Sequence, residues 1–86
     1  GRKASTLEHL LKLDITAIVF ESPHRIIKTL EEVRKLSPGR EIFVGRELTK
    51  LHEECFWGTV ENVLEKLKKK SSIKGEIVLV ISRGEG

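Results

Sequence analysis

Cysteine is nearly absent from this 86-residue chain, which has one, Cys55, and contains no methionine. A single cysteine excludes an internal disulfide and favours a reducing compartment, which predicts a cytoplasmic protein. No apolar run approaches the roughly 20 residues that a transmembrane helix needs, and no signal peptide opens the chain. Because methionine is missing and Gly1 stands first, we expect a fragment of a longer protein.

The composition is that of one folded domain. Hydrophobic residues make up 38% and charged residues 34% of the sequence, which is typical of a globular protein and not of a disordered one. A chain of 86 residues has room for a single modest core, so we expect one domain over residues 1–86. The net charge of +3 allows an anionic partner without indicating which one.

Apolar periodicity predicts seven elements in the order α-β-α-β-β-α-β. Helices are expected from Leu7 to about Leu13, from Pro23 to the residues before Pro38, and after a cap at Thr59. Strands are expected over residues 15–20, 41–44, 54–58 and 76–81. The last six elements match the split βαβ pattern, which predicts an α/β or α+β fold with a mixed sheet of about four strands.

The segment Glu21-Ser22-Pro23-His24-Arg25 follows the first expected strand and is the first candidate site. Ligands commonly lie at the carboxyl end of a strand, and a helix N-terminus offers free N–H groups. His24 and Arg25 place positive charge where the helix dipole disfavours it. Either a function or a compensating partner, such as Glu21 for Arg25, has to explain this placement.

The segment GRELTKLHEE, residues 45–54, is the second candidate site. It is longer and more charged than an ordinary hairpin turn. One interpretation is a solvated loop with neutralising pairs such as Arg46 with Glu53. The other is a binding segment on a rigid sheet, in which Arg46 and Lys50 hold phosphate. In that case Glu47, Glu53 and Glu54 orient these cations or contact a cationic ligand.

Two further patterns have ordinary explanations. His52 and Cys55 have zinc-like spacing, but the chain has no second cysteine and no HExxH motif, so no metal is expected. The lysines of residues 66–74 complement a helix dipole, and no aromatic residues are interleaved with them as in a sequence-specific RNA reader.

Four segments in a fixed order resemble one family: VFESPHRIIKTLEEV, GRELTKLHEE, the pair Gly58-Thr59, and KGEIVLVI. Together they extend over nearly the whole chain and resemble ribosomal RNA small subunit methyltransferase I, of the tetrapyrrole methylase superfamily. The resemblance implies the C-terminal domain of a two-domain, S-adenosylmethionine-dependent enzyme, usually a homodimer, that methylates a cytidine ribose 2′-hydroxyl in 16S rRNA of the small ribosomal subunit. Since the Gly-rich cofactor segments of the N-terminal half are absent, the resemblance also implies that this chain alone is inactive.

The resemblance implies roles for residues of both candidate sites. Those expected near the cofactor are Phe20, Glu21, Ser22, Pro23, Gly75 and Glu76. Those expected on a proton path are His24, Glu47 and Lys50, with the base itself left open, and those expected at RNA phosphate are Arg25, Arg46 and Lys50. Relatives often carry tyrosine where this chain has Phe20, so this position has no phenol hydroxyl.

Two alternatives stand beside this interpretation. One is a superfamily relative that acts on a tetrapyrrole or another small molecule, against which GRELTKLHEE argues because it resembles the rRNA branch. The other is a free-standing RNA-binding module with the split βαβ fold. Such a module presents exposed aromatic residues on its sheet, and the sequence predicts none there.

Overall fold

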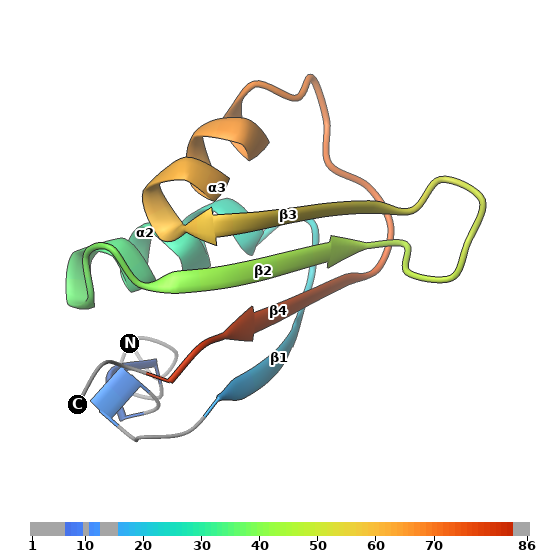
Figure 1. Ribbon diagram of the computed structural model, residues 1–86. Helices are drawn as coiled ribbons and strands as arrows, with labels where there is room; N and C mark the ends of the chain where they lie inside the picture. The colour runs from blue at the N-terminus through green and yellow to red at the C-terminus, as the bar shows by residue number, and fades with distance from the viewer. Residues whose placement is uncertain (1–6, 10, 13–15, 84–86) are drawn as a thin grey trace.

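Figure 1 shows the computed structural model, which describes residues 7–9, 11–12 and 16–83. Its elements are β1 (Ala17–Glu21), α2 (Ile26–Leu36), β2 (Glu41–Arg46), β3 (Glu54–Thr59), α3 (Val60–Lys68) and β4 (Ile77–Ile81). Residues 7–9 and 11–12 are helical as well. The predicted order of elements and the α+β class are confirmed, while the expected helix end at Leu13 and strand start at Ile15 lie outside the described residues.

The four strands form one sheet in the order β1-β4-β2-β3. Every neighbouring pair is antiparallel. β4 lies between β1 and β2, and β2 lies between β3 and β4, so both helical connections are split βαβ units. The described sheet is therefore antiparallel throughout and not mixed as expected, because in each split unit a strand of opposite direction lies between the two parallel ones.

The core lies between one face of the sheet and the helices (Figure 1). α2 contributes the fully buried Ile26, Leu30 and Val33, and α3 contributes Val63 and Leu64. These side chains pack in one cluster with alternate residues of β2 and β4, and Leu7 joins it from the N-terminal helical residues. No helix in the described ranges is long and apolar enough to cross a membrane.

The other face of the sheet is left uncovered by the described helices. Alternation along the strands directs six apolar side chains to it, which we call the open face: Ile18, Phe20, Phe43, Trp57, Val78 and Val80. Phe20 and Trp57 are 80% and 67% exposed. The expectation of no exposed aromatic residues on the sheet is therefore wrong, because an apolar strand does not reveal which of its faces the helices cover.

The helix starts agree with the sequence in one case and differ in the other. The Thr59 hydroxyl accepts a hydrogen bond from Asn62 N–H at 3.3 Å, which confirms the predicted cap of α3. α2 begins at Ile26 and not at Pro23. The N–H groups of Arg25 and Ile26 both donate to the Ser22 carbonyl at 3.1 Å, so the intervening residues form a turn that leads into the helix.

Candidate functional site

Both segments singled out from the sequence leave the sheet at the same edge. The strand register places Glu21, Ile77, Arg46 and Glu54 in one row across the four strands. The turn after β1, the β2–β3 loop and the connection before β4 therefore start or end side by side (Figure 1). We call residues 21–25, 46–54 and 70–76 the charged edge.

Arg46 connects the parts of the charged edge on its β2 side. Its side chain is only 15% exposed. Nε donates to Glu54 Oε1 at 2.9 Å, Nη1 to the Lys74 carbonyl at 2.9 Å, and Nη2 to the His52 carbonyl at 3.1 Å. Because these acceptors belong to β3, to the connection before β4 and to the β2–β3 loop, one guanidinium ties both connections to the end of β2.

Glu54 is a carboxylate shared between two cations. Besides Arg46, it accepts a hydrogen bond from Lys70 Nζ at 3.0 Å. The bonds from Lys70 and Arg46 hold the pKa of Glu54 below its usual value. The neutralising partner suggested for Arg46 was Glu53, but that side chain accepts instead from the Thr49 N–H at 2.8 Å and closes the loop on itself.

Glu47, Lys50 and Glu76 form a second network at the charged edge. Glu47 N–H donates to the Glu76 carbonyl at 2.9 Å, and the Glu47 carboxylate accepts the Glu76 N–H at 3.1 Å. Lys50 Nζ lies 3.5 Å from Glu47 Oε2 and 3.0 Å from Glu76 Oε1. The structure thus brings together four residues that the sequence named from two distant segments: Glu47, Lys50, Gly75 and Glu76.

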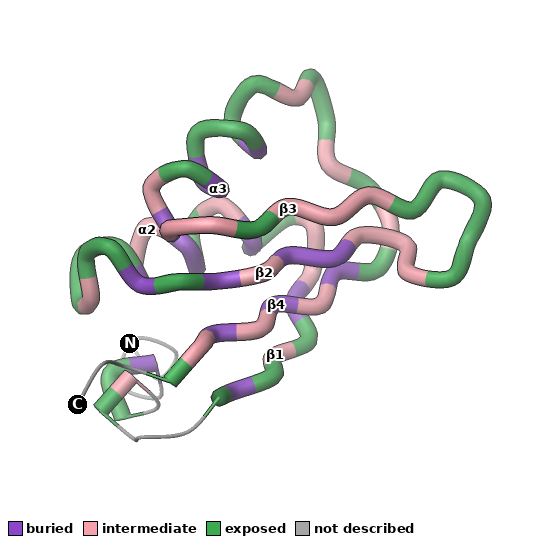
Figure 2. Tube along the Cα trace, viewed as in Figure 1, coloured by how far each residue is buried: buried purple, intermediate pink, exposed green. Residues whose placement is uncertain are grey.

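These contacts fix the charges of the network. The backbone N–H of Glu76 lowers the pKa of Glu47, and the hydrogen bond to the Glu76 side chain raises the pKa of Lys50. Lys50 is therefore a cation, which suits it to hold an anion and makes it a poor proton acceptor. Its side chain is 53% exposed, and the loop around it is exposed (Figure 2), so an anion can reach it.

The backbone of this loop is constrained. Glu47 and Thr49 have positive φ angles of 53° and 65°. Left-handed backbone at a residue with a Cβ costs about 1 kcal/mol or more, so the surrounding bonds have to hold it in place. The Lys50 N–H donates to the Glu47 carbonyl at 3.0 Å, and Gly75, with φ of 88°, lets the chain pass close to Glu47.

Glu21 and Phe20 point to opposite faces of the sheet. Glu21 is buried on the helix side, where its carboxylate accepts hydrogen bonds from Ser22 N–H at 2.9 Å and from Thr29 Oγ1 at 2.6 Å. The predicted partner of Glu21 was Arg25; the bond with Thr29 was not predicted, although a polar residue at an inward helix position is a recognisable signal. Phe20 belongs to the open face.

The remaining residues of the turn differ in exposure. Ser22 and Pro23 are half-buried, whereas His24 and Arg25 are exposed. His24 and Arg25 are therefore accessible to solvent, while Ser22 and Pro23, two of the candidates for the cofactor, are partly covered. No cluster of three histidine, cysteine or acidic side chains suited to a metal ion occurs among the described residues.

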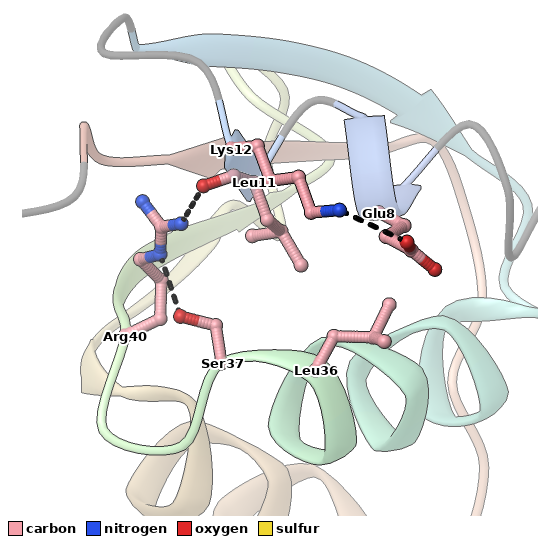
Figure 3. Close-up of a pocket in the computed structure, with 6 residues that line it drawn as sticks. All are labelled: Glu8, Leu11, Lys12, Leu36, Ser37 and Arg40. Carbon is pink, nitrogen blue, oxygen red and sulfur yellow. Dashed lines mark hydrogen bonds and ion pairs between the residues drawn. The ribbon is translucent and has the colours of Figure 1, made fainter.

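A groove of about 340 Å³, shown in Figure 3, lies at the end of the sheet opposite the charged edge. Arg40 borders it and is only 8% exposed. Its guanidinium donates to Ser37 Oγ and to the carbonyls of Leu11 and Ser82. Because these acceptors belong to three parts of the chain, Arg40 holds these parts together and has a structural role. No motif in the sequence pointed to this residue.

Known proteins resemble the chain over most of its length. Ribosomal RNA small subunit methyltransferase I of Hydrogenobaculum sp. is 50% identical over 66 residues, which is 77% of this chain. The proteins of the same name from Helicobacter pylori and Thermotoga maritima are 45% and 39% identical over 77% and 92% of the chain. The chain is therefore similar in sequence to this family over most of its own length. No protein-family model matches the sequence.

The chain is much shorter than these methyltransferases. It spans 29%, 23% and 35% of the lengths of the three relatives. The alignment to the Thermotoga maritima protein extends over 79 residues, which is 92% of the chain. It therefore includes both candidate segments. The aligned stretch thus contains the segments that form the charged edge.

We expect acid to destabilise the fold through the charged edge. Glu47 and Glu54 have lowered pKa values when folded, so their stabilising contribution is complete above the ordinary value of 4.5 and is lost as pH falls through the folded pKa. Urea unfolding between pH 7 and pH 3 measures this loss. Glu54→Gln should lower stability at pH 7 and flatten the decline below pH 4.5; an unchanged decline would contradict the role of Glu54.

Proposed function

We propose that this chain is the C-terminal domain of an S-adenosylmethionine-dependent methyltransferase that methylates a cytidine ribose 2′-hydroxyl in 16S rRNA. The observation that carries the proposal is the 39% to 50% identity to proteins named ribosomal RNA small subunit methyltransferase I. The full-length protein, as we propose it, is a cytoplasmic homodimer. Its substrate is the small ribosomal subunit.

The residues of the charged edge fit one wall of a cofactor site. S-adenosylmethionine supplies an activated methyl group on a positively charged sulfonium, for which carboxylates are suitable neighbours. Glu76, whose side chain is 80% exposed, offers such a carboxylate beside the Gly75 backbone. On the other segment, half-buried Ser22 and Pro23 offer a surface at the start of α2.

The cations of the charged edge have different tasks in this proposal. Lys50 is charged and half exposed, so it holds an RNA phosphate beside the target ribose. Arg25 is exposed and serves the same purpose from the other segment. Arg46 has most of its donors engaged within the protein, so it contributes by positioning the loop that carries Lys50.

Methyl transfer also needs a group that accepts the ribose hydroxyl proton. His24 is exposed at the charged edge, and an imidazole is the side chain that most often accepts a proton in enzyme reactions. Glu47 is the other candidate, but the Glu76 N–H that lowers its pKa makes it a weaker base. We therefore propose His24 as the proton acceptor and Glu47, whose carboxylate lies 3.5 Å from Lys50 Nζ, as the residue that orients Lys50.

A methyl-transfer assay tests the proposal. Full-length protein and this 86-residue chain are each incubated with labelled S-adenosylmethionine and small ribosomal subunits, and the product is located by mass spectrometry. We expect 2′-O-methylcytidine from the full-length protein and none from the chain alone. Absence of transfer to RNA by the full-length protein would contradict the proposal and favour a small-molecule methylase.

In the full-length protein, Lys50→Ala should reduce methylation by at least about tenfold, because a lost phosphate contact misplaces the ribose relative to the methyl group. Lys35→Ala is the matched control, since Lys35 is an exposed lysine in the last turn of α2, at the other end of the sheet. Equal activity of the two variants would remove Lys50 from the site.

A further inference from the structure

Residues 66–74, which we call the lysine segment, carry charge of one sign only. They contain no acidic residue and five lysines: Lys66, Lys68, Lys69, Lys70 and Lys74. The net charge of the whole chain is only +3, so acidic residues outnumber basic ones in the rest of the chain. Solvated surfaces ordinarily mix both signs, as α2 does with its lysines, arginine and glutamates. The lysine segment departs from that pattern.

The helix dipole accounts for only part of this charge. Lys66 and Lys68 lie in the last turn of α3, where cations complement the dipole. Lys74 lies beyond the helix, in the connection that leads to β4, and the effect of the dipole falls off within the last turn. The segment therefore holds more positive charge than the stability of α3 explains.

Two of the five lysines link elements of the fold. Lys68 Nζ lies 3.1 Å from Glu31 Oε2 in α2. Lys70 Nζ lies 3.0 Å from Glu54 Oε1 in β3 and 5.9 Å from the centre of the Phe56 ring. The Lys70 side chain is only 28% exposed. These two lysines therefore have structural roles.

The other three lysines are available to a partner. Lys66 and Lys74 are exposed and make no ion pair with the residues that the structure describes. Lys69 Nζ lies 3.5 Å from Glu65, but its side chain is 75% exposed, so water screens this pair. Since Lys66 lies one helical turn before Lys70, it lies on the same side of α3, towards β3.

The lysine segment leads directly into the charged edge. The Lys74 carbonyl accepts a hydrogen bond from Arg46, which also holds the β2–β3 loop through the His52 carbonyl. That loop carries Lys50. Figure 1 shows the segment as the orange trace from the end of α3 to the start of β4, at the edge where the β2–β3 loop leaves the sheet. An anionic chain held at Lys50 can therefore continue over the lysine segment.

We propose that the lysine segment binds the sugar-phosphate backbone of rRNA away from the target nucleotide, through Lys66, Lys69 and Lys74. The inference rests on the proposed function, which supplies the class of partner, and it adds a contact surface that takes no part in methyl transfer. Lysine is a point charge on a flexible stem, so it holds phosphate without reading the bases. The exposed Ser71 and Ser72 add hydroxyl donors between these lysines.

The chemistry of the segment favours RNA over a membrane surface. A helix that lies on a membrane inserts exposed apolar side chains beside its cations. The apolar residues of the lysine segment are Leu67, which is buried, and Ile73, which packs against the core. The segment therefore offers positive charge without an apolar face.

The salt dependence of binding measures these contacts. Each phosphate contact releases counterions, so the logarithm of the binding constant falls with the logarithm of salt concentration by about 0.7 to 0.9 per contact. In the full-length protein, Lys66→Gln with Lys74→Gln should lower this slope by about 1.4 to 1.8 and weaken binding about 15- to 30-fold near 150 mM salt. Binding to small ribosomal subunits and to protein-free 16S rRNA is measured from about 50 to 200 mM salt.

Arg34→Gln with Lys35→Gln is the matched control. It removes two exposed positive charges from the last turn of α2, at the other end of the sheet, so it changes the net charge by the same amount. Its slope and affinity should stay close to those of the parent protein. Because Lys66 and Lys74 are exposed, the test variant should keep the circular dichroism spectrum and the unfolding midpoint of the parent.

Two binding results would overturn the inference. One is a salt slope for Lys66→Gln with Lys74→Gln that equals the slope of the control variant. The other is a slope that changes with small ribosomal subunits but not with protein-free 16S rRNA, because the partner would then be an acidic protein surface. A lowered slope with both probes supports contact with the RNA backbone.

Methylation separates this inference from the proposed function. At saturating small ribosomal subunits, Lys66→Gln with Lys74→Gln should keep the kcat of the parent and raise KM, whereas Lys50→Ala should reduce methylation even at saturation. A parent that methylates rRNA, with a test variant that matches the control in slope and KM, overturns the lysine segment alone. A parent that does not methylate rRNA, with a lowered slope in the test variant, contradicts the proposed function alone.

Discussion

Replacing Arg46, the last residue of β2, with alanine is expected to lower the free energy of unfolding by about 2 to 4 kcal/mol. The substitution removes the donors of three acceptors: the Glu54 carboxylate and the carbonyls of His52 and Lys74. It also disconnects the β2–β3 loop from the connection before β4. Urea unfolding at pH 7 measures the change.

Two further variants make this test specific. Arg46→Lys keeps the charge, but one ammonium lacks the planar fork that reaches the three acceptors, so it should recover only part of the loss. Arg34→Ala removes an exposed arginine of α2 and should change stability by less than about 0.5 kcal/mol. If Arg46→Ala changed the free energy of unfolding as little as Arg34→Ala, the Arg46 guanidinium would not hold these segments together.

Gly75→Ala is expected to destabilise the chain by about 2 to 4 kcal/mol. Gly75 has a φ of 88°, and an added Cβ would lie 2.3 Å from Cδ of Glu47. The Glu47 side chain would have to move, and it would then lose its bond to the Glu76 N–H and its contact with Lys50. Thermal and urea unfolding measure the effect.

The matched control for this substitution is Gly39→Ala. Gly39 has a φ of 80°, but an added Cβ would meet no atom within 4 Å, so only the backbone cost of about 1 kcal/mol remains. The double variant Glu47→Ala with Gly75→Ala should be more stable than additivity predicts, because the clash is gone. If Gly75→Ala and Gly39→Ala lowered the free energy of unfolding equally, the close packing of Gly75 against Glu47 would be contradicted.

Local patterns were sufficient to predict the elements of this fold. Apolar periodicity fixed the order of helices and strands, and the Thr59 cap is a contact between neighbours in sequence. The start of α2 was placed too early because Ser22-Pro23 carries helix-start signals, while the backbone there makes a turn first. Local chemistry alone does not decide between these two conformations.

Contacts between segments were not predictable in the same way. Arg46 meets Glu54 and not Glu53 because the two are register partners across β2 and β3, and a one-residue change of register would reverse the choice. The meeting of Glu47 and Lys50 with Gly75 and Glu76 depends on the position of β4 beside β2. The charge of residues 45–54 pointed to Glu47 and Lys50, and the family resemblance pointed to Gly75 and Glu76, but neither revealed that the four residues form one network.

The position of β4 also has a consequence for how the chain folds during synthesis. β4 follows the other described strands in sequence but is an inner strand of the sheet, and among the described strands it alone joins β1 to the β2–β3 hairpin. Until Ile77–Ile81 has left the ribosome, β1 and β2 have no strand between them, and their apolar edges and faces stay open. The sheet therefore cannot close until β4 is in place, and before that the separate strands expose surfaces that favour aggregation.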